Sequence, residues 1–118
     1  MLRASAKASD MTIDLRAVTI SNIQSGVPHG TELLAYADTI VGSDPTALTQ
    51  ARLALLSAMG PRALVQAAAI AANFSMNDRA ANATGITLES IFVRDSAEFR
   101  RELGIDGFPS ARNTLKRN

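Results

Sequence analysis

Few residues of this chain have side chains and spacing suited to catalysis. The 118-residue sequence contains no cysteine and a single histidine, His29. His29 and Glu32 stand where a helix is expected to start, and the free N–H groups of a helix start favour an anion. His29, Glu32 and Asp38 are candidates for a general acid or base, and Arg79 is a candidate for binding a carboxylate. Because nothing in the sequence shows that these side chains converge, it assigns no catalytic residue.

The absence of cysteine excludes whole classes of chemistry for this chain. Disulfides, thiolate metal sites and a thiol redox cycle all need a cysteine thiol, which the sequence lacks. We expect no metal site and no cofactor, and the absence of cysteine fits a cytoplasmic protein. The net charge of +1 creates no field that would steer nucleic acid to the surface, so no nucleic-acid partner is expected.

The two ends of the sequence differ in composition from its middle. Residues 1–10 indicate a flexible leader, without the apolar segment of a secretory signal. Residues 105–118 indicate a basic tail, in which Arg112, Lys116 and Arg117 have no acidic residue near them. Short basic tails are usually solvated. Residues 11–104 are predicted to form one helical domain.

No segment of the sequence is predicted to cross a membrane. A membrane helix needs about 18 consecutive apolar residues. The apolar run that ends at Phe74 is shorter, and Gln66 and Asn73 interrupt it. We therefore expect no membrane partner.

Glycine and proline divide the first part of the domain into helices. Thr31 is predicted to cap a helix with a one-sided apolar face, which Gly42 ends. The face consists of Leu33, Leu34, Ala37, Ile40 and Val41. Asp44 and Pro45 form a favourable start for a second helix, and Gly60 is predicted to end it.

Two stretches give a less regular pattern. Residues 11–24 fit either a strand or a helix, and we predict a short helix there. Residues 86–93 are predicted to be irregular or extended. A final helix is predicted to continue through Leu103, with Asp95 and Glu98 forming a pair that resembles a capping box.

The longest predicted helix is rich in alanine and runs from Pro61 to the glycine at position 85. On a helical wheel, four polar residues share one side of it and have apolar neighbours: Gln66, Asn73, Asn77 and Thr84. The opposite side is predicted to be the wetter face and carries Ser75, Asp78, Arg79 and Asn82.

Asn73 and Asn77 are therefore predicted to lie in an apolar neighbourhood. An unpartnered buried amide costs about 1–3 kcal/mol, so each should be hydrogen-bonded. Three interpretations fit: bonds to neighbouring helices or across a subunit contact, a pocket for a small polar ligand, or orientation of a catalytic group. Gln66, Asn73 and Asn77 are accordingly the candidate ligand-binding residues, and we favour the core or a subunit contact.

A recognisable order of sequence elements is present in two stretches, LLAYADTIVGSDPTAL at 33–48 and GPRALVQAAAIAANFSMNDRAANATGI at 60–86. It consists of an LLAFA-like helix, an acidic-Pro helix start, and a long helix ending F-x-x-x-x-R-x-A-[DN]-A-x-G. This ending is formed here by Phe74, Arg79, Ala81, Asn82, Ala83 and Gly85. In this order and spacing, residues 33–88 resemble the carboxymuconolactone decarboxylase and alkylhydroperoxidase D-like superfamily.

The resemblance implies an all-α, alkylhydroperoxidase D-like antiparallel helical bundle that assembles into dimers, trimers or hexamers. Peroxidases of the superfamily use a C-x-x-C pair with a nearby histidine, because one thiolate attacks the peroxide and a second thiol resolves it. Asn22, Ser25 and His29 have the spacing of such a motif with both sulfurs replaced. They lie closer to the LLAYA helix than the family's motif does, and His29 also fits an ordinary loop histidine.

Three functions stay open at this point. The first is a thiol-free, homo-oligomeric member of the superfamily without peroxidase activity. The second is a small cofactor-independent enzyme, similar to a decarboxylase, that acts on an organic acid. It predicts a pocket holding His29 or Arg79 beside Asn73 and Asn77. The third is an oligomeric binding module that reaches an acidic partner with its basic tail.

Overall fold

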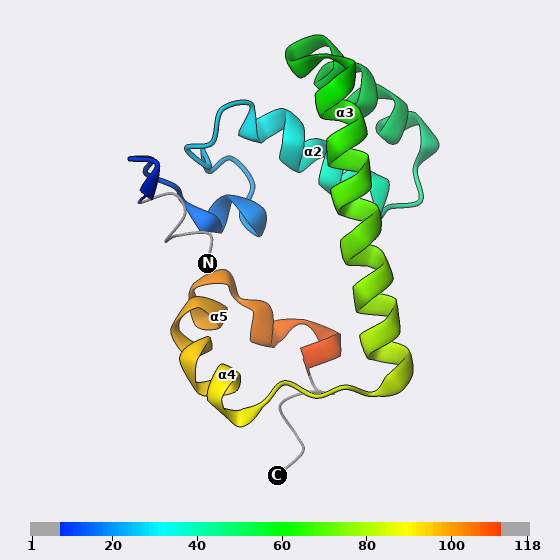
Figure 1. Ribbon diagram of the computed structural model, residues 1–118. Coiled ribbons are helices and arrows are strands. Elements are labelled where there is room, and N and C mark those ends of the chain that lie inside the picture. Colours follow the sequence, from blue (N-terminus) through cyan, green and yellow to red (C-terminus); the bar gives the residue numbers. More distant parts are fainter. Residues whose placement is uncertain (1–7, 112–118) are drawn as a thin grey trace.

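The computed structural model of the protein describes residues 8–111. The regular elements in this range are all helical, which confirms the all-α class (Figure 1). They are the 3₁₀ turn η1 (Leu15–Val18), the helices α2 (Gly30–Ile40), α3 (Pro45–Thr84), α4 (Ser90–Asp95) and α5 (Ala97–Leu103), and the 3₁₀ turns η2 (Ile105–Gly107) and η3 (Pro109–Ala111). Most of the predicted leader and the basic residues Arg112, Lys116 and Arg117 lie outside the described residues.

α3 consists of two helices that meet at a sharp bend. Gly60 has φ 81° and ψ 173°, a conformation that is essentially restricted to glycine. Oδ1 of Asp44 accepts hydrogen bonds from the backbone N–H of Thr46 at 2.8 Å and of Ala47 at 3.1 Å, so it caps the first helix. Gly85 ends the second helix in the left-handed conformation, with φ 67°. Both helices predicted from the sequence are thereby confirmed, and we call residues 61–84 the distal half of α3.

The N-terminal part of the chain differs from its prediction in two places. Residues 11–24 contain the predicted short helix, but it is the four-residue 3₁₀ helix η1, capped by the side chain of Asp14. α2 begins one residue before Thr31, and the residue at its N-cap is His29, in the left-handed conformation with φ 55°. Thr31 therefore lies inside the first turn, and its predicted capping role is wrong.

The C-terminal part also departs from its prediction. Residues 90–95 form the helix α4, where an irregular or extended connection was expected. α5 begins at Ala97, and its N-cap residue Ser96 makes no capping hydrogen bond with its side chain. Asp95 instead ends α4 and pairs with Arg94 at 3.1 Å. The predicted capping box of Asp95 and Glu98 is therefore wrong.

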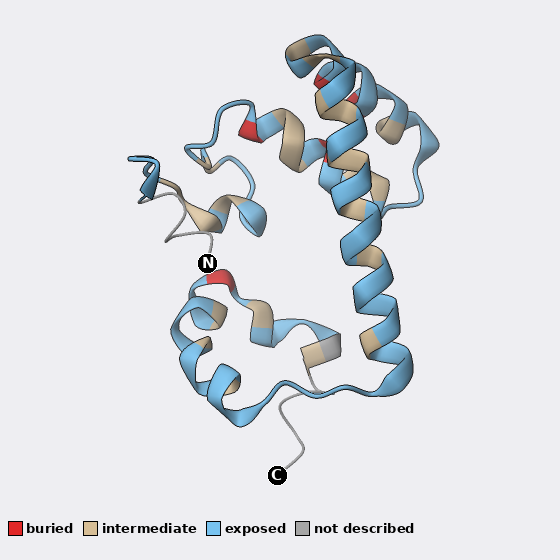
Figure 2. Ribbon diagram, in the orientation of Figure 1, coloured by how far each residue is buried: buried red, intermediate tan, exposed pale blue. Residues whose placement is uncertain are grey.

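The core lies where α2 packs against α3, the most extensive contact between elements (Figure 2). Leu55 is fully buried, and Tyr36 and Ala51 are buried beside it. Partly buried side chains surround this cluster: Leu33, Ile40, Leu48, Leu64, Ala67 and Ala68. Leu103 of α5 is buried in a separate place. The described residues thus hold a thin core for a chain of this length.

Residues 90–111, which we call the C-terminal unit, are held together by Arg100. Its guanidinium donates from Nη1 to the backbone carbonyl of Val93 at 2.6 Å and to Oγ of Ser96, and from Nε to Asp106 at 2.8 Å. α5 also contacts η1. In Figure 1 the unit lies below α2, at the far end of α3. The radius of gyration is 15.9 Å, against about 13.5 Å for a compact chain of this length. The helices are therefore packed less compactly than in a typical globular chain of this length.

Candidate functional site

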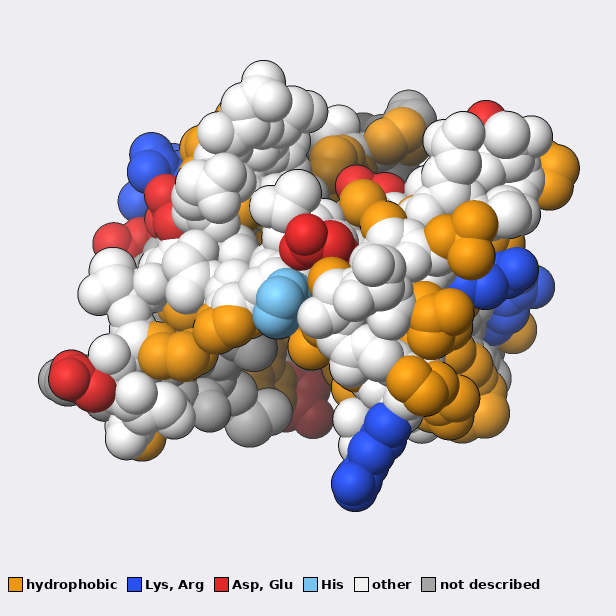
Figure 3. Space-filling model, turned by 90° about the horizontal axis from the view of Figure 1, so that it is seen from above, with side chains coloured by type: hydrophobic (Ala, Val, Ile, Leu, Met, Phe, Trp, Pro, Cys, Tyr) orange, Lys and Arg blue, Asp and Glu red, His pale blue; other side chains and the backbone are white. Residues whose placement is uncertain are grey.

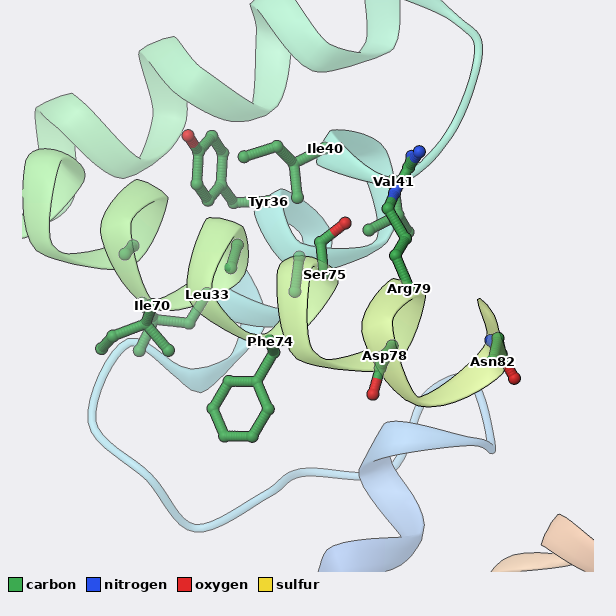
Figure 4. Close-up of a pocket in the computed structure, with 13 residues that line it drawn as sticks. Leu33, Tyr36, Ile40, Val41, Ile70, Phe74, Ser75, Asp78, Arg79 and Asn82 are labelled. Carbon is green, nitrogen blue, oxygen red and sulfur yellow. The ribbon is translucent and has the colours of Figure 1, made fainter. Parts of the chain in front are cut away.

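A hollow of about 490 Å³ lies between α2 and the distal half of α3, and we call it the groove (Figure 4). Its walls are mostly apolar. From α2 they comprise Leu33, Tyr36, Ala37, Ile40 and Val41, and from α3 Ala67, Ile70, Ala71 and Phe74. A volume of this size and an apolar lining are typical of sites that hold a drug-sized molecule or a few side chains of a partner.

The polar residues of the groove all come from the distal half of α3. They are Ser75, Asp78, Arg79 and Asn82. In Figure 4 the side chain of Arg79 extends toward the end of α2 that carries Val41, whereas Asp78 points the other way. Neither charged side chain forms an ion pair with another residue between positions 8 and 111. The groove therefore offers one unpaired cation and one unpaired anion next to an apolar wall.

The structure places the predicted catalytic candidates at opposite ends of α2. Arg79 lines the groove together with Val41, which follows the last residue of α2. His29 precedes the first residue of the same helix, is exposed, and makes no capping hydrogen bond. Val41 lies twelve positions after His29, which corresponds to about 18 Å of helix. Glu32 lies in the first turn beside His29, so the structure does not bring Arg79 together with these two residues.

The polar stripe of the distal half faces away from the groove. Gln66, Asn73, Asn77 and Thr84 are exposed, and none of them lines the groove. The prediction that Asn73 and Asn77 lie in an apolar neighbourhood of the chain is therefore wrong. The predicted pocket with Arg79 beside Asn73 and Asn77 does not form in the single chain.

Small side chains explain which side of the distal half meets α2. Ala67 and Ala68 pack against the core cluster, and Ala71 lines the groove. Three alanines on one side allow α2 to approach closely, and Ser75 and Asn82 follow them along the same side. The predicted wetter face is thus the one that turns toward α2. Tyr36, which the sequence analysis left out of the apolar face of α2, is its most buried side chain.

The altered peroxidase motif is not assembled either. Asn22 and Ser25 line a small polar hollow of about 250 Å³, together with Thr31 and Asp38, but His29 does not line it. Ser25 Oγ accepts a hydrogen bond from the backbone N–H of Val27 at 3.2 Å. These residues lie in the connection between η1 and α2 and share no helix.

Ionisable groups elsewhere add little to a catalytic site. A hydrogen bond to Asp14, and then the charge of that carboxylate, raise the pKa of Arg16, which keeps this exposed guanidinium charged. Within residues 8–111, no group of three or more His, Cys, Asp or Glu side chains is arranged to hold a metal ion.

A second hollow, of about 440 Å³, lies between the end of α3 and the C-terminal unit. Asn82, Ile86 and Leu88 line it from one side, and Arg100 and Phe108 from the other. Because Asn82 also lines the groove, the two hollows adjoin along α3.

The described surface is rich in uncovered apolar side chains. Figure 3 shows one face, where hydrophobic side chains gather in patches between few charged ones. α3 is also long and apolar enough to cross a membrane by length and composition, and only 6% of the relevant window is buried. The sequence argument that no stretch reaches this limit was therefore too strict. This length and apolar composition give only weak support for a membrane span, because a helix that packs against another protein can have the same length and composition.

Comparison with protein-family models, with curated proteins and with solved structures found no match to this chain. The resemblance to the carboxymuconolactone decarboxylase and alkylhydroperoxidase D-like superfamily accordingly stays a prediction from the sequence.

Proposed function

We propose that this protein works as a homo-oligomer and is a thiol-free member of the carboxymuconolactone decarboxylase and alkylhydroperoxidase D-like superfamily, without peroxidase activity. One observation carries the oligomer. Large apolar side chains are exposed along the distal half of α3: Val65 at 68%, Ile70 at 60%, Phe74 at 62% and Met76 at 61%.

These side chains lie on different sides of the helix, so the single chain leaves apolar side chains uncovered on more than one side of the distal half. The apolar surface of a helix is normally buried. Covering one such side chain fully contributes about 1.5–3 kcal/mol. A second copy carries the same uncovered surface, and joining the two would remove both from water. Oligomerisation therefore compensates for the thin core of one chain.

The concentration dependence of thermal unfolding tests the oligomer. If association stabilises the folded chain, the melting temperature rises as protein concentration rises, by mass action. Ile70→Lys should weaken this dependence, because Ile70 lines the groove and a buried ammonium at a contact is unfavourable. Thr49→Lys, on the exposed side of the first helix of α3, is the control and should keep it. A melting temperature that is independent of concentration would contradict the proposal.

The absence of peroxidase activity follows from the lack of a cysteine thiol. Reduction of a peroxide by this family's mechanism requires a thiolate that becomes a sulfenic acid and a second thiol that resolves it. The purified protein, given hydrogen peroxide and a dithiol reductant, should consume no more peroxide than the reductant alone. Faster consumption that depends on the protein would overturn this part of the proposal.

A small organic acid is the second candidate function, and the unpaired Arg79 favours it. An acid with an apolar body could place its carboxylate on the guanidinium of Arg79 and its body against Ile40 and Val41, toward which Arg79 extends (Figure 4). The structure brings no histidine to this place, so binding is expected to be separable from turnover. Calorimetry and thermal shift with benzoate and aliphatic carboxylates test it.

The controls for this second candidate lie on the same half-helix. Benzoate should stabilise the wild type and Arg62→Gln, whose side chain does not line the groove, but not Arg79→Gln. Equal stabilisation of both variants, or none of the wild type, would exclude the acid from the groove. Release of carbon dioxide from a bound acid would mark the protein as an enzyme.

A further inference from the structure

The groove is matched by a second uncovered surface, the outer face of α4. Ile91 and Phe92 are 51% and 57% exposed. The inner face of the same helix carries Val93, which is half-buried and whose carbonyl accepts the hydrogen bond from Arg100. α4 is therefore anchored to its own unit on one side and presents an apolar surface on the other.

The charges beside these two apolar surfaces are complementary. On α4, Arg94 and Asp95 follow the exposed pair and form an ion pair with each other across 3.1 Å, with side chains 75% and 59% exposed. On α3, Asp78 and Arg79 follow Phe74 in the reverse charge order. If α4 lies parallel to α3 with its apolar pair at Phe74, Arg94 meets Asp78, whose side chain points to the same side of α3 as Phe74, whereas Arg79 points the other way (Figure 4).

The spacing of the two patterns agrees as well. Arg94 lies three residues after Ile91 on α4, and Asp78 lies four residues after Phe74 on α3. At a rise of about 1.5 Å per residue, the two offsets differ by about 1.5 Å. Side chains of ordinary length span such a difference.

The chain's own α4 is poorly placed to enter the groove. In this register Ile91 lies at Phe74, eleven residues before Gly85, which is about 16.5 Å along the helix. The connection over residues 85–89 spans at most about 17 Å when fully extended, so it would have to run almost straight back along α3. In the structure it leads α4 away from α2, toward the opposite end of the molecule (Figure 1). A second copy is not restricted by this connection.

We propose that α4 of one copy docks in the groove of a second copy, with Ile91 and Phe92 against Ile70 and Phe74. Arg94 then pairs with Asp78 of the neighbour. This inference rests on the proposed homo-oligomer and names the surfaces that form it. It also assigns the groove to a protein segment in place of a small organic acid.

Site-specific cross-linking tests the contact, and the cysteine-free chain provides a clean background. Phe74→Cys and Phe92→Cys are placed on two chains with different tags, mixed, and treated with a short bismaleimide. The expected product contains both tags. Val65→Cys mixed with Phe92→Cys is the control, because Val65 is as exposed as Phe74 but lies outside the groove; this pair should give little product.

The outcomes separate this inference from the proposed function. An oligomer by light scattering without the Phe74–Phe92 product, or with equal product from Val65, would overturn the α4 contact and leave the oligomer standing. A monomer would overturn both. A Phe74→Cys/Phe92→Cys chain that links within itself would assign the groove to its own α4. Binding of benzoate that depends on Arg79, without the cross-link, would assign it to an organic acid.

Charge reversal gives a second readout that does not depend on the packing of the aromatic side chains. Asp78→Arg and Arg94→Asp should each weaken association about two- to fivefold, the range of a single exposed ion pair. Both together on one chain should restore it, because each copy then supplies the reversed partner to the other. Equal and additive losses in the double variant would contradict the pairing.

Discussion

The guanidinium of Arg100 lies 2.8 Å from the carboxylate of Asp106, joining the middle of α5 to the turn that follows it. The Arg100 side chain is only 13% exposed, and it also donates to the carbonyl of Val93 and to Ser96. One side chain therefore connects α4, α5 and η2. This network fixes the inner face of α4 and leaves Ile91 and Phe92 on the outer face.

Replacement of Arg100 should loosen the C-terminal unit. Arg100→Ala removes three hydrogen-bond partners of a largely buried cation, and each such bond contributes about 1.5–3 kcal/mol at most. We expect a loss of about 1–3 kcal/mol in the free energy of unfolding, measured by urea denaturation. Arg101→Ala, at an exposed neighbouring position, should change it by about 0.5 kcal/mol or less. Equal effects of the two substitutions would contradict the role of the network.

The bend in α3 depends on glycine. Gly60→Ala should destabilise the protein by about 1–3 kcal/mol, because its φ of 81° and ψ of 173° are strained for any side chain. The space around the position is open, so no steric clash contributes. Gly107→Ala, also in open space but without a positive φ, is the control in the same thermal unfolding measurement. A neutral Gly60→Ala would mean that the helix straightens there.

The contact between α2 and α3 should respond strongly to loss of Leu55. Its side chain is fully buried, whereas Leu53 in the same helix is 59% exposed. Leu55→Ala should cost about 2–5 kcal/mol through lost burial and the cavity left behind. Leu53→Ala, measured at low protein concentration, should cost about 0.5 kcal/mol or less. Similar losses at the two positions would place the core elsewhere.

The start of α3 should depend on its cap. Asp44→Ala removes the acceptor for two backbone N–H groups and should cost about 0.5–2 kcal/mol. Asp44→Asn keeps an oxygen in place and should cost less. Chemical denaturation of the two variants distinguishes capping from a general effect of charge, which would make them equal.

The sequence was informative wherever the signal is local to the backbone. Asp44, Gly60 and Gly85 determine helix ends through hydrogen bonds or φ angles that only certain residues supply, and the structure confirms all three. Thr31 failed as a cap because His29 occupies the left-handed position one residue before the helix. The missed helix α4 is short, and its stability comes from Arg100, seven residues after the bonded carbonyl of Val93.

The orientation of the distal half of α3 could not be read from its own residues. Its apolar side chains lie on more than one side of the helix, so the wheel has no clear buried side, and the side that meets α2 is decided by packing at Ala67 and Ala68. The helical wheel therefore predicted that Asn73 and Asn77 face apolar neighbours and that Arg79 lies on the wetter face. In the single chain Arg79 lines the groove, and the two asparagines are exposed outside it. Whether Asn73 and Asn77 meet a second subunit stays a prediction.

The central claim is that apolar surface left open by one chain is covered by another. Light scattering coupled to size exclusion measures this directly, because one chain has a mass of 12.5 kDa. The account predicts a mass of two or more chains at concentrations where the protein is folded, which decreases together with helicity on dilution. A folded protein that retains the mass of one chain at every concentration would contradict it.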